Sequence, residues 1–177
     1  MATLIRQATL KDASDIAKVQ VASWLAAYDT IVPAPVLAAQ SVERQEAFWR
    51  GVLSQRSDNV LVAVNGSGEI VAWVSSGQFR KQREAKDKGE IYAIYARPDY
   101  FRSGTGRLLW ESASPRLRQL GFLSVFALVI TDNHRARAFY EGVGFTLVRE
   151  SQSTFTWEGV QIGDVCYEYR YPKSALS

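Results

Sequence analysis

The chain has 177 residues, of which 47% are hydrophobic and 22% are charged, and its formal net charge at pH 7 is +3. This length suits one domain with its own core and is short for two, so we expect a single domain over residues 1–177. The small net charge argues against a nucleic-acid partner, which normally requires a much more basic face. No apolar stretch approaches the roughly 20 residues of a membrane span, and the N-terminus has no signal-peptide core. We therefore expect a cytoplasmic protein with no membrane partner, and composition leaves a homodimer open.

The first half of the chain predicts a strand, two helices and a hairpin. Thr9 and Asp12 form a capping-box pattern at the start of the first helix, and Pro33 and Pro35 end it. Ser41 is placed to cap the second helix. A turn rich in Asn, Gly and Ser separates the two strands of the hairpin. The expected elements are a strand over residues 4–8, helices from Thr9 towards Tyr28 and from Ser41 to Leu53, and strands over residues 59–64 and 70–76.

The second half alternates strands with helices. The run at residues 124–130 is almost entirely apolar, which is typical of a strand covered on both faces. The expected elements are strands over residues 90–96 and 124–130, helices over residues 104–120 and 133–143, and final strands over residues 145–156 and 164–171. The whole order predicts an α/β (α+β) fold, in which a mixed sheet of about seven strands is flanked by about four helices.

Cys166 and His134 are the only cysteine and histidine of the chain. A single cysteine excludes a disulfide within the chain, and the two residues are too few for a Cys/His zinc site, so we expect no metal. Cys166 lies in an alternating run, where a buried strand thiol is favoured over a nucleophile. Any nucleophile is therefore expected to come with a substrate.

A glycine-containing loop between a strand and a helix is the most informative motif. Gly104 and Gly106 stand on either side of Thr105 at the start of an apolar helix, so that successive backbone N–H groups can converge on one anion. Arg102 and Arg107 add positive charge on either side. An ordinary turn before a helix is the alternative interpretation, but the strand–loop–helix order favours a pyrophosphate site.

This loop and a second motif resemble those of the GCN5-related N-acetyltransferase (GNAT) superfamily. The family loop is usually (Gln or Arg)-x-x-Gly-x-(Gly or Ala), and its glycines match Gly104 and Gly106. Phe101 stands where Gln or Arg is expected, and the arginine is displaced to Arg102. The second family motif is Asn-x-x-Ala followed by Tyr and then Gly-Phe. It is matched in this chain by Asn133, Ala136, Tyr140, Gly144 and Phe145.

The resemblance implies a partly splayed sheet and a site for acetyl-CoA. In the family, the strands before and after the loop-and-helix unit diverge, and the pantetheine arm pairs with the freed backbone like an added strand. Core packing is the alternative for the strand residues, and a helix N-cap is the alternative for Asn133. The implied cofactor-binding residues are Ile94, Tyr95 and Ala96 for the pantetheine and thioester, Arg102, Ser103, Gly104, Thr105, Gly106 and Arg107 for the pyrophosphate, and Asn133 and Ala136 beside the pantetheine.

Tyr140 is the expected general acid. A phenol is protonated at neutral pH and can give its proton to the departing CoA thiolate. The alternative is a tyrosine that only packs on its helix. Family members that acetylate protein N-termini carry a glutamate where this chain has Leu128, so we rank Glu90 first as general base. A solvated strand-end carboxylate is the alternative for Glu90.

Four aromatic residues, Trp24, Tyr28, Trp73 and Tyr92, are expected to wall the acceptor pocket, although each also suits a core. The charged segment at residues 80–88 is expected to be a solvated loop, with a rim of the acceptor pocket as the alternative. The resemblance therefore implies an acetyl-CoA-dependent N-acetyltransferase that transfers acetyl directly to a small-molecule or peptide amine. Alternatives are another acyl-CoA, a hydroxyl acceptor, or a non-catalytic acyl-CoA-binding module.

Overall fold

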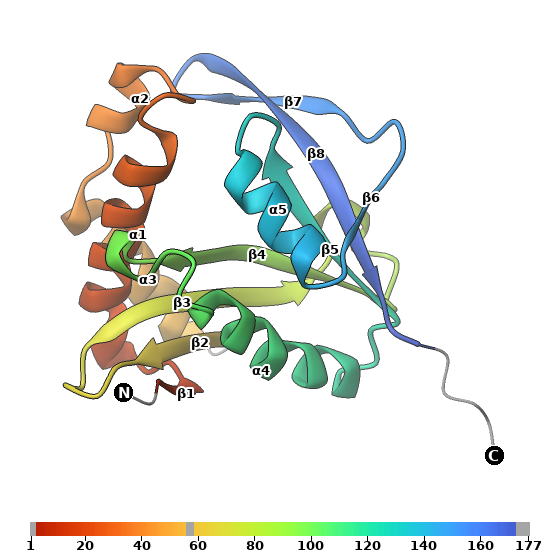
Figure 1. The fold of residues 1–177 in the computed structure, drawn as a ribbon, viewed down its shortest axis with the longest axis horizontal. Coiled ribbons are helices and arrows are strands. Elements are labelled where there is room, and N and C mark those ends of the chain that lie inside the picture. The colour runs from red at the N-terminus through yellow and green to blue at the C-terminus, as the bar shows by residue number, and fades with distance from the viewer. Residues whose placement is uncertain (1–2, 56–58, 173–177) are drawn as a thin grey trace.

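An eight-stranded mixed sheet with helices on both faces organises the described part of the chain, residues 3–55 and 59–172 of this computed structural model (Figure 1). The strands are β1 (Leu4–Gln7), β2 (Asn59–Val64), β3 (Ile70–Gln78), β4 (Lys88–Ala96), β5 (Ser124–Ile130), β6 (Thr146–Leu147), β7 (Ser153–Trp157) and β8 (Val160–Arg170). The helices are α1 (Ala13–Tyr28), α2 (Ala34–Ala38), α3 (Val42–Gln55), α4 (Thr105–Gln119) and α5 (His134–Gly142), with 3₁₀ turns η1 (Leu10–Asp12), η2 (Arg80–Gln82) and η3 (Pro98–Tyr100). The predicted fold class is confirmed.

Local side-chain chemistry sets where the N-terminal helices begin. The Asp12 carboxylate accepts hydrogen bonds from the backbone N–H and the hydroxyl of Thr9, at 2.7 and 2.9 Å, just before α1. The Ser41 hydroxyl accepts from the Arg44 N–H at 3.1 Å and caps α3. Between these helices, Pro33 and Pro35 begin the short α2, which the sequence did not predict. Proline fits the first helical turn because its missing N–H has no partner there.

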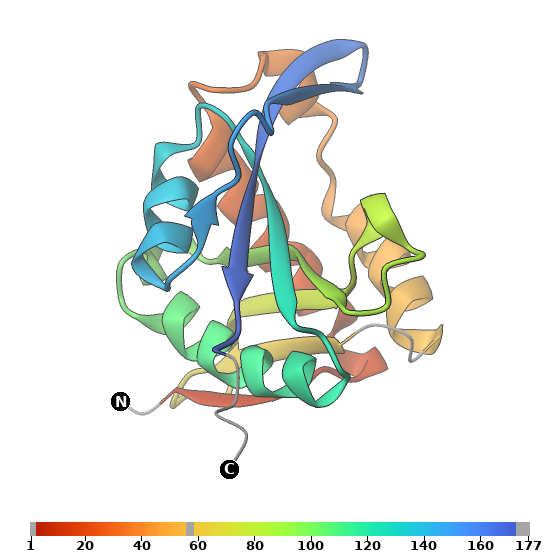
Figure 2. The same cartoon turned by 90° about the vertical axis from the view of Figure 1, so that its right-hand side faces the viewer.

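The middle of the sheet diverges where β4 and β5 separate. These strands pair in parallel only from Lys88 to Ile91 of β4 and from Ser124 to Ala127 of β5. Beyond that point β4 continues beside β3, whereas β5 continues beside β8 (Figure 2). Within residues 3–55 and 59–172, the edge of β4 that faces β5 therefore has no ladder partner over its last residues, and its N–H and C=O groups are available to a ligand.

The C-terminal strands differ from the prediction of one strand over residues 145–156. Two strands, β6 and β7, lie there, separated by Glu150 with φ of 54°. A non-glycine residue in this left-handed region cannot continue an extended strand. β8 also begins earlier than predicted, at Val160, after a tight turn in which Glu158 and Gly159 have φ of 46° and 80°. The resulting β7–β8 hairpin lies beside α2 (Figure 1).

The core consists of clusters on the two faces of the sheet. One cluster packs α4 and its neighbours against β2–β5 and β8, and includes Leu109, Leu117 and Tyr167. A second packs α1 and α3 against β2 and β3, and includes Ile16 and Trp73. A third joins α1 and α2 to the β7–β8 hairpin. None of the helices in the described ranges is long and apolar enough to cross a membrane.

Candidate active site

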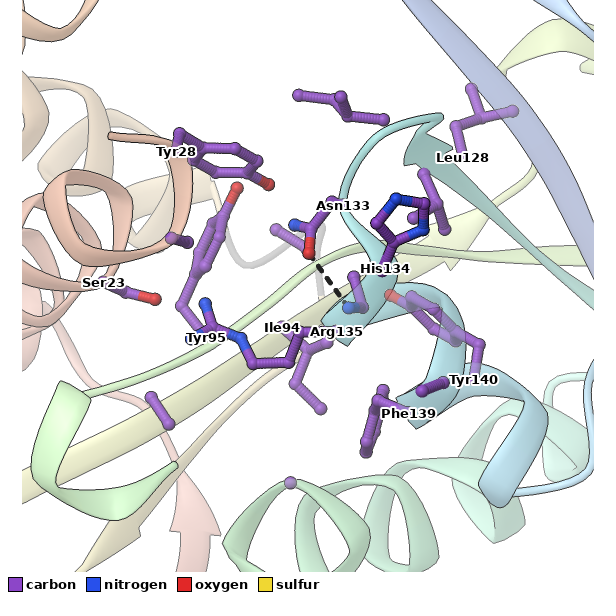
Figure 3. Close-up of a pocket in the computed structure, with 18 of the residues that line it drawn as sticks. Ser23, Tyr28, Ile94, Tyr95, Leu128, Asn133, His134, Arg135, Phe139 and Tyr140 are labelled. Atoms are coloured by element: carbon purple, nitrogen blue, oxygen red, sulfur yellow. Dashed lines mark hydrogen bonds between the residues drawn. The ribbon is translucent and has the colours of Figure 1, made fainter. Parts of the chain in front are cut away.

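A cavity of about 1080 Å³ lies where β4 and β5 diverge. Two regions of it are distinct. The loop end is lined by the segment before α4 and by α5, including Phe101, Gly104, Gly106 and Tyr140. The chamber is lined by α1, η2 and β7–β8, and its wall includes Trp24, Lys81, Ser153, Phe155, Trp157 and Asp164. Ile94, Tyr28 and Asn133 also line the cavity (Figure 3).

The loop end has the geometry of an anion cradle. Gly104 is the N-cap residue of α4 with φ of 86°, and Arg102 also has a positive φ, of 59°. The N-cap glycine has no side chain, and the Thr105 N–H donates a long hydrogen bond of 3.4 Å to the Ser103 hydroxyl. By helix geometry the next N–H groups, those of Gly106 and Arg107, have no intrahelical partner, and both residues line the cavity. A Cβ atom on Gly106 would lie 3.0 Å from the Phe139 ring, so this glycine also allows α4 to approach α5.

Ser103, Thr105 and Arg107 hold the loop in place, and of these only Arg107 lines the cavity. Ser103 and Thr105 do not line the cavity, and their hydroxyls form a hydrogen bond of 2.8 Å with each other. The Arg107 guanidinium donates to the Gly142 carbonyl at 2.7 Å and so links α4 to the end of α5. The hydroxyls of Ser103 and Thr105 are therefore turned to each other and not to the cavity.

Arg135 is a charged residue of the site that the sequence analysis missed. Its guanidinium stacks on the Phe101 ring at 3.7 Å, which is a short cation–π contact. Burial lowers the pKa of Arg135, and the charge of nearby Arg102 lowers it further. No carboxylate among residues 3–55 and 59–172 forms an ion pair with Arg135. Phe101 stands where the family loop has Gln or Arg, and Arg135 lies on its ring.

Tyr140 projects from α5 into the cavity. The residue is 6% exposed, and its ring packs against Phe139 and Phe145 with centroids 5.2 Å away in both cases. Its hydroxyl makes no hydrogen bond to any described residue and faces the pocket (Figure 3). Burial raises the pKa of Tyr140 far above its ordinary value, so the phenol stays protonated. Packing and a free, cavity-facing hydroxyl therefore coexist in one residue.

Asn133 is the N-cap residue of α5, as the alternative interpretation expected. Its Oδ1 accepts from the Ala136 N–H at 3.0 Å (Figure 3). Both residues also line the cavity. The cap thus holds two positions of the second family motif at the cavity wall.

The predicted aromatic wall is present in part. Trp24 and Tyr28 line the cavity, and the Trp24 indole donates to the Tyr95 hydroxyl at 2.8 Å. Burial raises the pKa values of both Tyr28 and Tyr95, which keeps both phenols neutral. Tyr92 lines the cavity too, and its hydroxyl donates to the Gln78 carbonyl at 2.8 Å.

Trp73 does not line this cavity. Its side chain is buried on the α1–α3 face of β3, with its ring centroid 4.6 Å from that of Trp49. It lines a separate cavity of about 370 Å³ between that face and α3. The core interpretation of this residue is therefore the one that the structure supports.

Glu90 differs from both interpretations offered for it. The residue is 0% exposed and does not line the cavity, because it belongs to the half of β4 that still pairs with β5. Its carboxylate accepts from the Arg80 backbone N–H at 2.8 Å and from the Arg80 guanidinium at 3.1 and 2.6 Å. A buried carboxylate fixed in this way anchors η2 at the rim of the chamber and is not a solvated base.

We expect Glu90→Gln to act on stability and not on the chemical step. The variant loses charge-assisted hydrogen bonds, so its free energy of unfolding should fall by about 1–3 kcal/mol. Chemical denaturation measures this loss, and turnover at saturating substrates should stay within about threefold of the wild-type value. A stable variant with turnover reduced a hundredfold would instead support Glu90 as the base.

Asp164 is the second residue of the site that the sequence analysis missed. It is 7% exposed, lines the chamber and accepts a short hydrogen bond from the Ser153 hydroxyl. Lys81 and Arg80 line the same chamber, which supports the alternative interpretation of residues 80–88 as a pocket rim.

Cys166 is half-buried, and burial raises the pKa of its thiol to about 11, consistent with a structural role.

Comparisons with known proteins agree on one family. The family model described as "Acetyltransferase (GNAT) family" matches residues 21–145. The chain is 34% identical to "Uncharacterized N-acetyltransferase YuaI" of Bacillus subtilis (strain 168) over 161 residues, which is 91% of this chain and 89% of that protein.

Solved structures share the fold at lower identity. PaiA N-acetyltransferase from Thermoplasma acidophilum, solved in complex with coenzyme A, has a TM-score of 0.75 and 19% identity, covering 97% of this chain and 100% of that one. The putative acetyltransferase yncA from Salmonella typhimurium, solved with acetyl-CoA, has a TM-score of 0.73 and 18% identity, covering 100% and 98%.

Proposed function

This chain belongs to the acetyltransferase (GNAT) family, and we propose that it transfers acetyl from acetyl-CoA directly to an amine held in the chamber. The observation that carries the proposal is one continuous cavity that joins an anion cradle, a free phenol and an aromatic chamber. Such an arrangement lets two substrates meet at the divergence of β4 and β5. The proposal also places the enzyme in the cytoplasm, with a small-molecule or peptide amine as its partner.

The loop end fits the anionic part of CoA. The residues that would hold the pyrophosphate are Arg102 and the backbone from Ser103 to Arg107, at the N-terminus of α4. Arg135 would supply the cation that Phe101 does not, since it lies on that ring with no carboxylate partner in the described part of the chain. The open edge of β4 at Ile94, Tyr95 and Ala96 would pair with the pantetheine amides.

The middle of the cavity fits the proton transfers that the reaction needs. The amine attacks the thioester carbonyl carbon as a free base, the C–N bond forms and the C–S bond breaks. The departing thiolate takes the Tyr140 hydroxyl proton, and the surplus proton of the amine nitrogen returns to Tyr140 through water. Because the pKa of Tyr140 is raised, this residue is restored to its neutral form after each turnover.

A thiol-release assay tests the proposal. Wild-type protein, acetyl-CoA and a panel of amines should release free CoA faster than acetyl-CoA and protein alone, and mass spectrometry should find the acetylated amine in equal amount. Tight CoA binding by calorimetry, with no amine raising thiol release above the no-acceptor rate, would show instead a non-catalytic acyl-CoA-binding module.

We expect chelators to leave this activity unchanged. Thioester aminolysis needs no Lewis acid, and the described residues contain no cluster of three His, Cys, Asp or Glu side chains that could hold a metal ion. Turnover measured before and after incubation with EDTA should agree. A loss that one added metal ion restores would contradict this expectation.

A further inference from the structure

Asp164 is the one carboxylate among the described residues that line the cavity, whereas several lining residues are cationic. It lies on β8 and pairs with Ile130 of β5, and Ile130 is three positions before Asn133. Asp164 and Asn133 both line the cavity. A single acid in an otherwise basic cavity marks the place where a cationic group of the acceptor binds most favourably.

The two oxygens of Asp164 differ in how well they are satisfied. Oδ1 accepts from the Ser153 hydroxyl, whereas Oδ2 makes no hydrogen bond within the described ranges. The nearest cation to Oδ2 is Lys81 Nζ at 3.9 Å, beyond the 2.7–3.2 Å typical of an N–H···O bond. Because Asp164 is more than nine-tenths buried, leaving one of its carboxylate oxygens without a hydrogen-bond donor lowers the stability of the fold. Oδ2 is therefore available to a donor from a ligand.

Lys81 stands on the other side of this opening. Its side chain is 50% exposed and donates to the Ser153 hydroxyl at 3.3 Å, which leaves two further ammonium protons for another acceptor. Because the Lys81–Asp164 contact is long and half-exposed, it contributes little by itself. The two groups thus present a separated positive and negative charge, both on the chamber wall.

The rest of the chamber wall is apolar and aromatic. Trp24 of α1 and Trp157 of β7 pack edge to face, with ring centroids 4.1 Å apart. Phe155, on the same strand as Trp157, lines the chamber and remains 37% exposed. An acceptor that binds the charged pair can therefore place an apolar or aromatic group against these rings.

We propose that the acceptor is a zwitterionic amine, an α-amino acid with an apolar or aromatic side chain; this rests on the proposed function. Its ammonium donates to Asp164 Oδ2, and its carboxylate accepts from Lys81. Before attack the ammonium passes one proton to Oδ2, and the nitrogen lone pair then attacks the thioester carbonyl carbon, so that the C–N bond forms and the C–S bond breaks. Tyr140 protonates the thiolate and regains a proton from the amide nitrogen through water, and the Oδ2 proton leaves to solvent.

Matched substrate pairs test the proposal. Phenylalanine, leucine, methionine and tryptophan are each compared with their amides, which keep the amine and the side chain but lack the carboxylate. For at least one of these side chains, the kcat/KM of the wild-type protein should be about tenfold or more higher for the acid than for its amide. A charge-assisted hydrogen bond between the substrate carboxylate and Lys81 is strong enough for a difference of this size. Equal kcat/KM for all acid–amide pairs, or thiol release only with amines outside this class, would overturn the inference while leaving the proposed function intact.

Variants separate the two charged groups. Lys81→Met keeps the aliphatic stem and should bring the acid/amide ratio to within about threefold of one, whereas Lys86→Met, on the same charged segment but off the cavity, should keep the wild-type ratio. Asp164→Asn can still accept from Ser153 and should lower kcat/KM about tenfold or more for both acids and amides, with CoA affinity retained. A Lys81→Met variant with the wild-type ratio, or a folded Asp164→Asn variant with wild-type kcat/KM, would contradict the assignment.

Discussion

Replacing Gly104 with valine should abolish CoA binding in a folded protein, whereas the same replacement at Gly68 should not. Both glycines have φ of +86°, and an added Cβ at either position would meet nothing within 4 Å. Both variants therefore carry a similar backbone strain, of the order of 1–2 kcal/mol or somewhat more for a β-branched residue. Only Gly104 lines the cavity, at the N-terminus of α4, where its side chain would occupy the space of the pyrophosphate.

Isothermal titration calorimetry with CoA is the measurement. The Gly104→Val variant should lose about 100-fold or more in affinity, since several charge-assisted hydrogen bonds from backbone N–H groups are lost together. Gly68→Val, in the turn between β2 and β3, reports the effect of strain alone and should bind CoA as the wild type does. Undiminished CoA affinity in a folded Gly104→Val variant would place the pyrophosphate elsewhere.

Replacing Tyr140 with phenylalanine should lower kcat by about 100-fold and leave the fold intact. The Tyr140 hydroxyl has no protein partner among the described residues, so its removal breaks no structural hydrogen bond, and the ring keeps its contacts with Phe139 and Phe145. Burial raises the pKa of Tyr140, so the acid stays protonated and its ionisation should cause no loss of kcat up to about pH 9.

Tyr167 provides the matched control. Its ring stacks on that of Tyr140 with centroids 6.3 Å apart, but its hydroxyl donates to Glu141 at 2.7 Å and accepts from Arg137 at 3.1 Å. Tyr167→Phe should therefore cost about 1–3 kcal/mol of stability while keeping kcat, the reverse of Tyr140→Phe. If Tyr140→Phe retains wild-type kcat where chemistry limits the rate, Tyr140 only packs and water protonates the thiolate.

Local signals in the sequence predicted most of the fold and the loop end. Ser41 caps α3, Asn133 caps α5 and Gly104 adopts the left-handed conformation that the loop requires. Each of these features depends on residues a few positions apart, so spacing along the chain was sufficient. The strand over residues 124–130 was also predicted with its full length, because an uninterrupted apolar run marks a covered strand.

Contacts between distant segments could not be predicted in the same way. Glu90 and Trp73 were assigned to the site. Glu90 lies in the part of β4 that still pairs with β5, and the Trp73 side chain lies on the face of β3 that α3 covers. Asp164 and Lys81 are 83 positions apart, and only the β7–β8 hairpin and η2 bring them together. The contact of Arg135 with Phe101 likewise joins α5 to the segment before α4. Side-chain direction depends on strand register, which the alternation of residues alone does not fix.

The central claim is that acetyl passes directly between two substrates held in one cavity. The most direct test is to measure initial rates while the concentrations of both substrates are varied. Double-reciprocal plots against acetyl-CoA at several fixed amine concentrations should give intersecting lines, and intact-protein mass spectrometry after incubation with acetyl-CoA alone should show an unmodified chain. Parallel lines, together with an acetylated chain that passes its acetyl group to the amine, would show a covalent intermediate and contradict direct transfer.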